Sequence, residues 1–134
     1  MNTTLSGKKV LYVEDDTFFA DIMSTKLAEH GCTMALATTG DQALKELEKD
    51  VPDLVVLDLM LPGGIDGFEV LEKMKAHESH KKIPVVILSN LDGLEDVEKG
   101  MQLGAFRYLT KSSVTPNEIV RDLEAALNAL QLEA

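Results

Sequence analysis

One segment near the middle of the chain specifies the architecture, and it reads Asp53-Leu54-Val55-Val56-Leu57-Asp58-Leu59-Met60-Leu61-Pro62-Gly63-Gly64. Its apolar residues 54–57, centred on two β-branched valines, predict a short strand that is buried on both faces. Pro62 and the glycines after it discourage further regular structure. We therefore expect Asp58 at the carboxyl end of a central strand, where open α/β sheets place their functional groups. Taken alone, Asp58 has a simpler interpretation as an aspartate that only ends the strand.

Apolar segments outside this region predict the rest of the fold. Four more segments have the composition of strands: 9–13, 33–37, 85–88 and 106–109. Five segments carry apolar residues at helical spacing, and they begin near Thr17, Gly40, Gly67, Leu94 and Pro116. Five strands that alternate with five helices predict an α/β fold, in which a parallel sheet is covered by helices on both faces through right-handed crossovers.

Several helix boundaries carry local signals. Gly31 is placed to end the first helix, and Gly104 to end the fourth. The sequence Thr115-Pro116-Asn117-Glu118 combines a capping Thr, a Pro at the first helical position and a Glu three residues after the cap, which predicts a helix start. Gly100 lowers the helix propensity of residues 94–103. The first seven residues and the last few are expected to be loosely held.

Size and charge limit the classes of function. The 134 residues suffice for one domain, and we expect a single domain over residues 1–134 with an ordered core of about 8–130. The 13 basic and 23 acidic residues give a net charge of −10, which repels nucleic acid and anionic membranes. Aromatic residues make up only 4% and Trp is absent, so an aromatic platform for nucleic-acid bases is not expected.

The chain carries no signal for export or membrane insertion. Residues 1–7 lack the apolar core of a signal peptide, and no apolar run approaches the roughly 20 residues of a membrane span. Cys32 is the only cysteine, which excludes an internal disulfide and predicts a small buried apolar residue. We therefore expect a cytoplasmic protein.

Polar side chains stand where the predicted strands end. They are Glu14 and Asp15 after the first strand, Asp58 after the third, Ser89 after the fourth and Lys111 just beyond the fifth. The carboxyl ends of parallel strands share one edge of a sheet, so we expect these residues to converge. Three carboxylates in one crevice repel each other unless a proton or a cation lies between them, and hard oxygen ligands at an open, wet site favour Mg²⁺.

This constellation is typical of phosphoryl transfer. Asp58 is the expected nucleophile and would form an aspartyl-phosphate. Ser89 can donate a hydrogen bond to a phosphoryl oxygen, and the Lys111 ammonium can contact both Asp58 and the incoming group. Each residue alone has a simpler interpretation, as a strand-end cap, a helix-starting serine or a solvated lysine. Their joint placement at the strand ends favours phosphoryl transfer.

Five motifs stand together in this sequence: Val13-Glu14-Asp15-Asp16, Leu57-Asp58-Leu59-Met60-Leu61-Pro62 with Asp66-Gly67, Leu88-Ser89, Leu103-Gly104-Ala105, and Tyr108-Leu109-Thr110-Lys111. With them the chain resembles the receiver domains of two-component response regulators, the CheY-like family, from about residue 8 to residue 130. The resemblance implies a flavodoxin-like (βα)5 fold with the strand order 2-1-3-4-5.

The resemblance also implies roles for the clustered residues. Asp58 would accept a phosphoryl group from a histidine on a partner kinase, or from a phosphotransfer protein. Glu14, Asp15 and Asp58 would hold Mg²⁺ together with the backbone carbonyl of Met60, with Asp15 the more direct ligand of the acidic pair. Lys111 would contact Asp58 and the phosphoryl group.

The same resemblance implies how a signal leaves the domain. Ser89 and Tyr108 match the family's switch pair, in which the hydroxyl moves toward the phosphoryl group and the aromatic ring turns inward. The added charge would alter the surface at residues 91–101, 106–110 and 117–127 for a downstream protein target. A homodimer through this surface is an alternative. No enzymatic activity is expected beyond assistance to the domain's own phosphorylation and dephosphorylation.

Three departures from the family's pattern affect the site. The loop at residues 62–67 is one residue longer than usual, which leaves its shape open. Lys111 is followed by Ser112 instead of proline. A cis bond before Ser costs about 2.5–4 kcal/mol, so we expect a trans bond or a strained exception, with consequences for where Lys111 lies. Asn90 replaces the small residue common after the switch hydroxyl and can crowd the approach to Asp58.

Two apolar residues bear on the lifetime of an aspartyl-phosphate. Met60 and Leu91 flank the expected line of attack on the phosphoryl group. Neither side chain can orient a water molecule, so we predict slow self-dephosphorylation. A half-life of seconds in the purified protein would contradict this prediction.

Residues outside the constellation have structural interpretations. His77 and His80 are compatible with a metal pair, but a solvated loop after the third helix is the favoured interpretation. His30 is expected at a helix end, where positive charge is favourable. Four methionines are expected to fill the core: Met23, Met34, Met74 and Met101.

Three other functions are compatible with this fold class. A phosphatase of the haloacid-dehalogenase type resembles this layout, but it has a second Asp two residues after its nucleophile, where this chain has Met60. A phosphorylation-independent interaction module would normally have lost part of the acidic site. A flavin-binding protein would need a donor-rich phosphate loop where this chain has Glu14-Asp15-Asp16. We rank all three below the receiver interpretation.

Overall fold

The computed structural model describes residues 5–133, with side chains for residues 5–130. One five-stranded sheet contains β1 (Lys9–Val13), β2 (Thr33–Ala37), β3 (Leu54–Leu57), β4 (Val85–Ser89) and β5 (Arg107–Thr110). All pairings are parallel, and the order is β2-β1-β3-β4-β5. The predicted α/β class and strand order are therefore confirmed.

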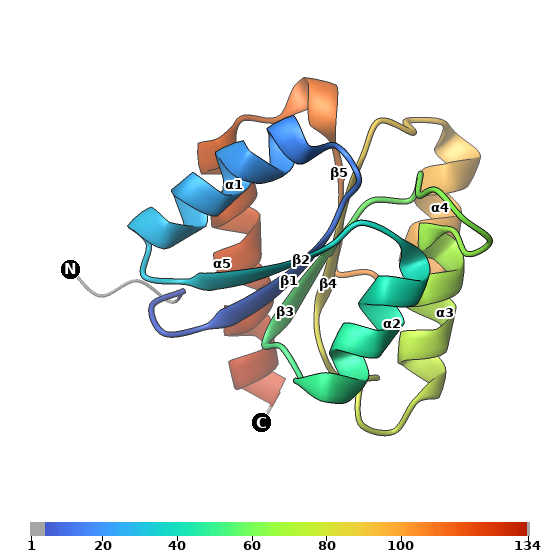
Figure 1. Ribbon diagram of the computed structural model, residues 1–134, viewed down its shortest axis with the longest axis horizontal. Coiled ribbons are helices and arrows are strands. Elements are labelled where there is room, and N and C mark those ends of the chain that lie inside the picture. The colour runs from blue at the N-terminus through green and yellow to red at the C-terminus, as the bar shows by residue number, and fades with distance from the viewer. Residues whose placement is uncertain (1–4, 134) are drawn as a thin grey trace.

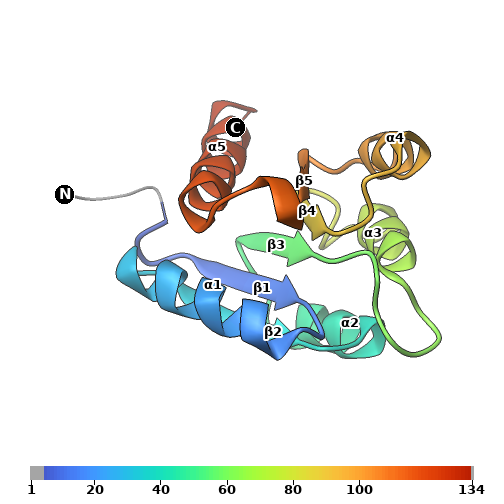
Figure 2. The ribbon, with the colours of Figure 1, turned by 90° about the horizontal axis from the view of Figure 1, so that it is seen from above.

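Helices cover both faces of the sheet. They are α1 (Thr17–Glu29), α2 (Gly40–Lys49), α3 (Gly67–Ala76), α4 (Leu94–Gln102) and α5 (Pro116–Glu133), with a short 3-10 helix η1 (Lys111–Ser113) after β5. Figures 1 and 2 show α1 and α5 on one face of the sheet and α2, α3 and α4 on the other. No helix in the described part of the chain is long and apolar enough to cross a membrane.

The core has two halves because side chains alternate across each strand. Val10 and Tyr12 of β1 lie in the half beneath α1 and α5, whereas Leu11 and Val13 lie in the half beneath α2 and α3. All four residues of β3 are buried, as expected for a central strand covered on both faces. The sheet thereby holds the segment that ends in Asp58 rigidly in the middle of the molecule.

Side-chain caps begin several of the helices, including the one predicted at Thr115. The side chain of Asp66 accepts a hydrogen bond from the Glu69 N–H at 2.9 Å, which starts α3. At the start of α5, Thr115 and Glu118 exchange reciprocal hydrogen bonds of 3.1 and 3.2 Å, so the predicted capping box is confirmed. His30 is the C-cap of α1, as expected, and Gly31 follows it with a φ of 76°.

Four predictions about individual segments are wrong. Strand β5 runs one residue later than expected, and the 3-10 helix after it was not predicted. Leu5 belongs to the segment expected to be loose, yet it is wholly buried in the core half beneath α1 and α5. Met101 is 42% exposed on α4 instead of filling the core. His80 is buried, whereas a solvated loop was expected. Residues 1–4 and 134 lie outside the described residues.

Candidate functional site

Strand register brings the acidic residues together. Val13 of β1 pairs with Leu57 of β3, so the residues that follow them, Glu14 and Asp58, leave the sheet side by side. The Asp58 N–H donates to the Val13 carbonyl at 3.0 Å, which extends the ladder to the site itself. Carboxylate oxygens of Glu14, Asp15 and Asp58 all lie within 4.8 Å of one another. The predicted convergence of these three residues is thus observed.

Lys111 reaches the same cluster from the end of β5, which is separated from β3 by β4. Its ammonium forms ion pairs with Glu14 Oε1 and, at 3.0 Å, with Asp58 Oδ2. The Lys111 side chain is only 8% exposed, and its ammonium lies 5.2 Å from the centre of the Phe19 ring. Every peptide bond in the described residues is trans, so the Lys111–Ser112 bond is trans. The lysine therefore contacts Asp58 without the cis bond that the family's proline favours.

Asp58 is held as a carboxylate. Burial by itself raises its pKa, but hydrogen bonds from Glu14 and the Met60 N–H, together with the Lys111 charge, lower the pKa below its ordinary value. The Met60 N–H donates to Asp58 Oδ1 at 3.1 Å, and Lys111 contacts Oδ2. An ionised, oriented carboxylate is the form that can act as a nucleophile.

Glu14 has the opposite balance. Its side chain is wholly buried, and burial together with the neighbouring Asp58 carboxylate raises its pKa to about 7 against the lowering effect of Lys111. Tyr12, whose own pKa is raised by burial, keeps its proton and donates a hydrogen bond to Glu14 Oε1 at 3.3 Å. The pKa values of the two neighbouring acids are thus shifted in opposite directions, so Glu14 takes up a proton more readily than Asp58.

The donor set fits a hard divalent cation. Three carboxylates face one ammonium, which leaves an excess of negative charge in a confined space. Asp15 is exposed, so the cluster opens to water on one side, as a Mg²⁺ site that keeps several water ligands requires. Glu14, Asp15 and Asp58 are the residues that can hold the ion. Ligation of Mg²⁺ by the Met60 carbonyl remains a prediction. The N–H of the same residue donates a hydrogen bond to Asp58.

Ser89 and Tyr108 are connected through the backbone of Leu91. Ser89 is wholly buried at the end of β4, and its Oγ accepts a hydrogen bond from the Leu91 N–H at 3.3 Å. The half-buried Tyr108 hydroxyl donates to the Leu91 carbonyl at 2.5 Å. Burial and the charges of Asp96, Asp58 and Asp92 raise the pKa of Tyr108 to about 12, so it remains a donor. The two predicted switch residues thus both form hydrogen bonds with the backbone of Leu91, between β4 and α4.

Gly100 explains how the ring of Tyr108 fits. A Cβ at this buried glycine of α4 would lie 2.7 Å from Ile87 Cδ1 and 3.2 Å from Tyr108 Cδ2. Close packing of α4 against β4 and β5 therefore explains why a residue of low helix propensity stands at this position.

The long loop after Asp58 closes without displacing that residue. Gly63 adopts a φ of 92°, which suits glycine. Ile65 then packs against Gly40 at the start of α2, and the Gly67 N–H donates to the Leu59 carbonyl at 3.1 Å. A Cβ at Gly67 would lie 2.3 Å from the Asp58 carbonyl oxygen, so this position requires glycine. The extra residue is absorbed at the surface. Asn90 is exposed, and its effect on access to Asp58 remains a prediction.

Sequence reasoning missed two polar contacts. One is the Tyr12 hydroxyl, which the alternation of β1 places on the same face as Glu14; that alternation was a usable signal. The other is His80, whose ring stacks on His77 with centroids 4.1 Å apart and whose Nε2 lies 3.1 Å from the Leu47 carbonyl. His80 therefore connects the loop after α3 to α2. The Nδ1 of His77 accepts a hydrogen bond from the Ser79 N–H at 3.1 Å, so one nitrogen of each ring already has a partner in the protein.

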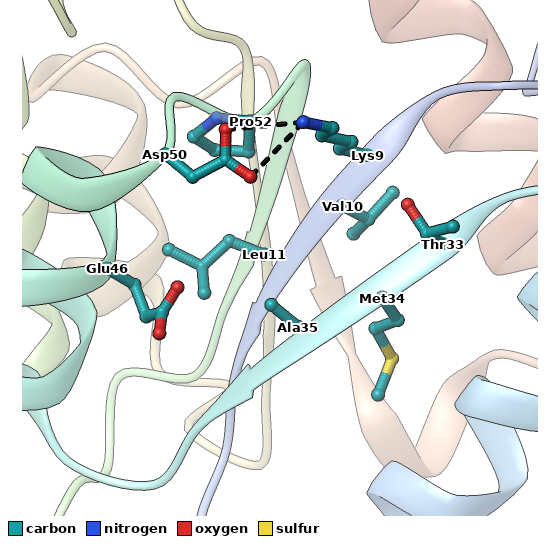
Figure 3. A pocket seen from close by; sticks show the side chains of 9 residues that line it. All are labelled: Lys9, Val10, Leu11, Thr33, Met34, Ala35, Glu46, Asp50 and Pro52. Atoms are coloured by element: carbon teal, nitrogen blue, oxygen red, sulfur yellow. Dashed lines mark hydrogen bonds and ion pairs between the residues drawn. The ribbon is translucent and has the colours of Figure 1, made fainter.

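A small pocket lies at the opposite edge of the sheet. It has a volume of about 170 Å³ and is lined by the amino ends of β1 and β2 and by the end of α2. Lys9 and Asp50 form an ion pair of 3.2 Å across it, as Figure 3 shows. None of the clustered residues described above lines this pocket. This pocket and the acidic cluster therefore lie at opposite edges of the sheet.

Comparison with known proteins agrees with this geometry. The family model of the response regulator receiver domain matches residues 10–124, which includes each clustered residue. This chain belongs to the receiver domain family. The predicted family is thus confirmed, and the acidic cluster of this receiver domain lies at the carboxyl edge of the sheet, at the ends of β1 and β3.

Several relatives show the range of the family. This receiver domain is 33% identical to the alkaline phosphatase synthesis transcriptional regulatory protein PhoP of Bacillus subtilis, over 96% of this chain and 52% of PhoP. It is 32% identical to protein PilG of Pseudomonas aeruginosa, over 83% of this chain and 82% of PilG. The chain thus spans about half the length of PhoP. A CheY-like receiver domain protein from Methanospirillum hungatei superposes with a TM-score of 0.86 at 27% identity, over 95% of this chain and 98% of that one.

Proposed function

We propose that this receiver domain is a phosphorylation-controlled switch, in which Asp58 accepts a phosphoryl group from a phosphohistidine on a kinase or phosphotransfer protein. The observation that carries the proposal is the ion pair of Lys111 with Asp58 inside a cluster of three carboxylates. We propose one such domain within residues 1–134, with a cytoplasmic location. The family match over residues 10–124 and the single continuous sheet support this extent.

Each clustered residue has its own proposed role in phosphoryl transfer. Asp58 is ionised, and the Met60 N–H orients its carboxylate. One carboxylate oxygen attacks phosphorus while the bond between phosphorus and the donor nitrogen breaks. The leaving nitrogen keeps the electron pair of that bond. Lys111, already beside Asp58 Oδ2, stabilises negative charge on the transferred group. Bound Mg²⁺, held by Glu14, Asp15 and Asp58, would neutralise charge on the phosphoryl oxygens.

The signal is proposed to leave through the segment between β4 and α4. A phosphoryl group on Asp58 adds charge and acceptor oxygens, and the Ser89 hydroxyl at the end of β4 is the donor that we propose for one of these oxygens. If Ser89 turns toward the phosphoryl group, its hydrogen bond with the Leu91 N–H is lost, and the Tyr108 bond to the Leu91 carbonyl is disturbed. The affected surface is α4, β5 and α5, where we place the downstream protein target or a second copy of the chain.

The test is mass spectrometry after incubation with acetyl phosphate and Mg²⁺. Wild-type protein is expected to gain one phosphoryl group, and the Asp58→Asn variant none. Omission of Mg²⁺ should strongly slow the gain. A phosphoryl group on both proteins, or on neither, would overturn the proposed function.

A further inference from the structure

Tyr12 carries a polar group into the core for which packing gives no reason. The residue is wholly buried within the core half beneath α1 and α5, among apolar neighbours such as Val10, Met23 and Leu54. A phenylalanine ring would fill the same space. A hydroxyl buried without a partner costs about 1–3 kcal/mol, so it needs an acceptor. That acceptor is Glu14 Oε1, at 3.3 Å.

Glu14 depends on its donors for a defined position. Its Oε1 is shared by the Tyr12 hydroxyl and the Lys111 ammonium, and its Oε2 accepts from the Asp16 N–H at 3.4 Å. A glutamate has one more rotatable bond than an aspartate, so its carboxylate can take more positions. The contacts described above therefore define where the Glu14 carboxylate lies. Tyr12 approaches from the core and Lys111 from the direction of Asp58.

We propose that Tyr12 is a positioning residue for the metal pocket: its hydroxyl holds Glu14 where the carboxylate can join Asp15 and Asp58 in binding Mg²⁺. The inference rests on the proposed function. Without the hydroxyl, Lys111 would be the remaining side-chain donor to Glu14 Oε1 in the described structure and would keep this oxygen from the ion. Groups that orient a metal ligand in this way change metal affinity when they are removed, typically by 10- to 100-fold.

The test is Tyr12→Phe, which removes one oxygen and leaves the ring. Mg²⁺ affinity is measured by calorimetry and by the change in amide chemical shifts as Mg²⁺ is added to the metal-free protein. Phosphorylation by acetyl phosphate is followed over a range of Mg²⁺ concentrations. We expect a Mg²⁺ dissociation constant about tenfold higher than that of wild type, with phosphorylation restored at saturating Mg²⁺. An unchanged Mg²⁺ affinity would overturn the inference.

Two controls separate positioning from a loss of stability. Leu123→Val shortens another wholly buried side chain in the same core half without touching Glu14, so it should lower stability and leave Mg²⁺ affinity unchanged. In a Glu14→Gln background, Tyr12→Phe should have no further effect on Mg²⁺ affinity, because the hydroxyl acts through Glu14. A full additional loss in that background, or an equal loss in Leu123→Val, would contradict a positioning role.

The outcome for wild type distinguishes the two proposals. If wild type gains a phosphoryl group and Asp58→Asn does not, the proposed function stands whatever Tyr12→Phe does, and only the role of Tyr12 is at stake. If wild type binds Mg²⁺ but gains no phosphoryl group, the proposed function fails. The calorimetric comparison still decides whether Tyr12 positions Glu14.

Discussion

The Lys111 ammonium lies 3.0 Å from Asp58 Oδ2, although the two residues are 53 positions apart in the sequence. Both side chains are more than nine-tenths buried, and the same ammonium also pairs with Glu14. One cation thus pairs with two buried acids. Its removal would leave two buried carboxylates with no cationic partner in the described structure.

Lys111→Met is expected to lower the unfolding free energy of the metal-free protein by about 3 kcal/mol, because a buried carboxylate loses its partner. The control is Lys9→Met, which breaks the exposed pair between Lys9 and Asp50 and should cost less than about 1 kcal/mol. Urea denaturation of both variants measures the difference. Equal losses in the two variants would show that Lys111 is not structurally coupled to the acids. Lys111→Met should also slow phosphorylation by acetyl phosphate.

Stability of the metal-free protein is expected to fall as the pH rises from 5 to 8. The pKa of Glu14 is raised from 4.5 to about 7 on folding, so in this window the folded protein retains a proton that the unfolded chain releases. The expected loss is about 1–3 kcal/mol. The pKa of Asp58 is shifted the other way, below 3.8, so its contribution lies at lower pH.

Two comparisons check this assignment. Glu14→Gln removes the titrating group, so its unfolding free energy should change less between pH 5 and pH 8 than that of wild type. Mg²⁺ should also reduce the loss, because the ion stabilises the ionised acids of the folded state. Thermal or urea denaturation across this pH range measures both effects. A wild type whose stability rises over the window would contradict the assignment to Glu14.

Gly67→Ala is expected to destabilise the protein by about 1–3 kcal/mol. The added methyl group would meet the Asp58 carbonyl and the Leu59 Cα, which are backbone atoms and cannot move aside by a change of rotamer. Gly64→Ala is the matched control in the same loop, because nothing lies within 4 Å of a Cβ there. Urea denaturation should show a clear loss for Gly67→Ala and little change for Gly64→Ala. Similar values for both would mean that the loop relaxes freely.

Met60→Asn is expected to shorten the lifetime of the phosphorylated protein. The Met60 side chain is 55% exposed beside Asp58, and an amide at this position can orient a water molecule for attack, which a thioether cannot do well. The measurement is the decay of the phosphorylated mass after removal of acetyl phosphate. We expect slow decay in wild type and faster decay in the variant. A wild-type half-life of seconds, or an identical decay in Met60→Asn, would refute the role of this apolar side chain.

The sequence alone predicted the five strands, the five α-helices and the three acids that cluster, but not the 3-10 helix after β5. The apolar run of β3, the capping box at Thr115 and the glycine after α1 are local signals, because strand burial, caps and turns depend on residues a few positions apart. Parallel strands then bring their carboxyl ends to one edge, so the sequence predicts that Glu14, Asp15 and Asp58 lie together, as they do.

Tertiary structure alone decided which polar groups touch. Leu5 and His80 are buried because distant elements cover them, and Met101 is exposed because its side of α4 is left uncovered. The reach of Lys111 to Glu14 and Asp58 depends on distances between strands, which no local pattern encodes. Alternation along β1 places Tyr12 and Glu14 on one face, but it does not show that their side chains form a hydrogen bond. Periodicity shows which face of an element a side chain occupies, but a hydrogen bond requires its two atoms to meet within a few tenths of an ångström. Only the packing of the whole chain sets that distance.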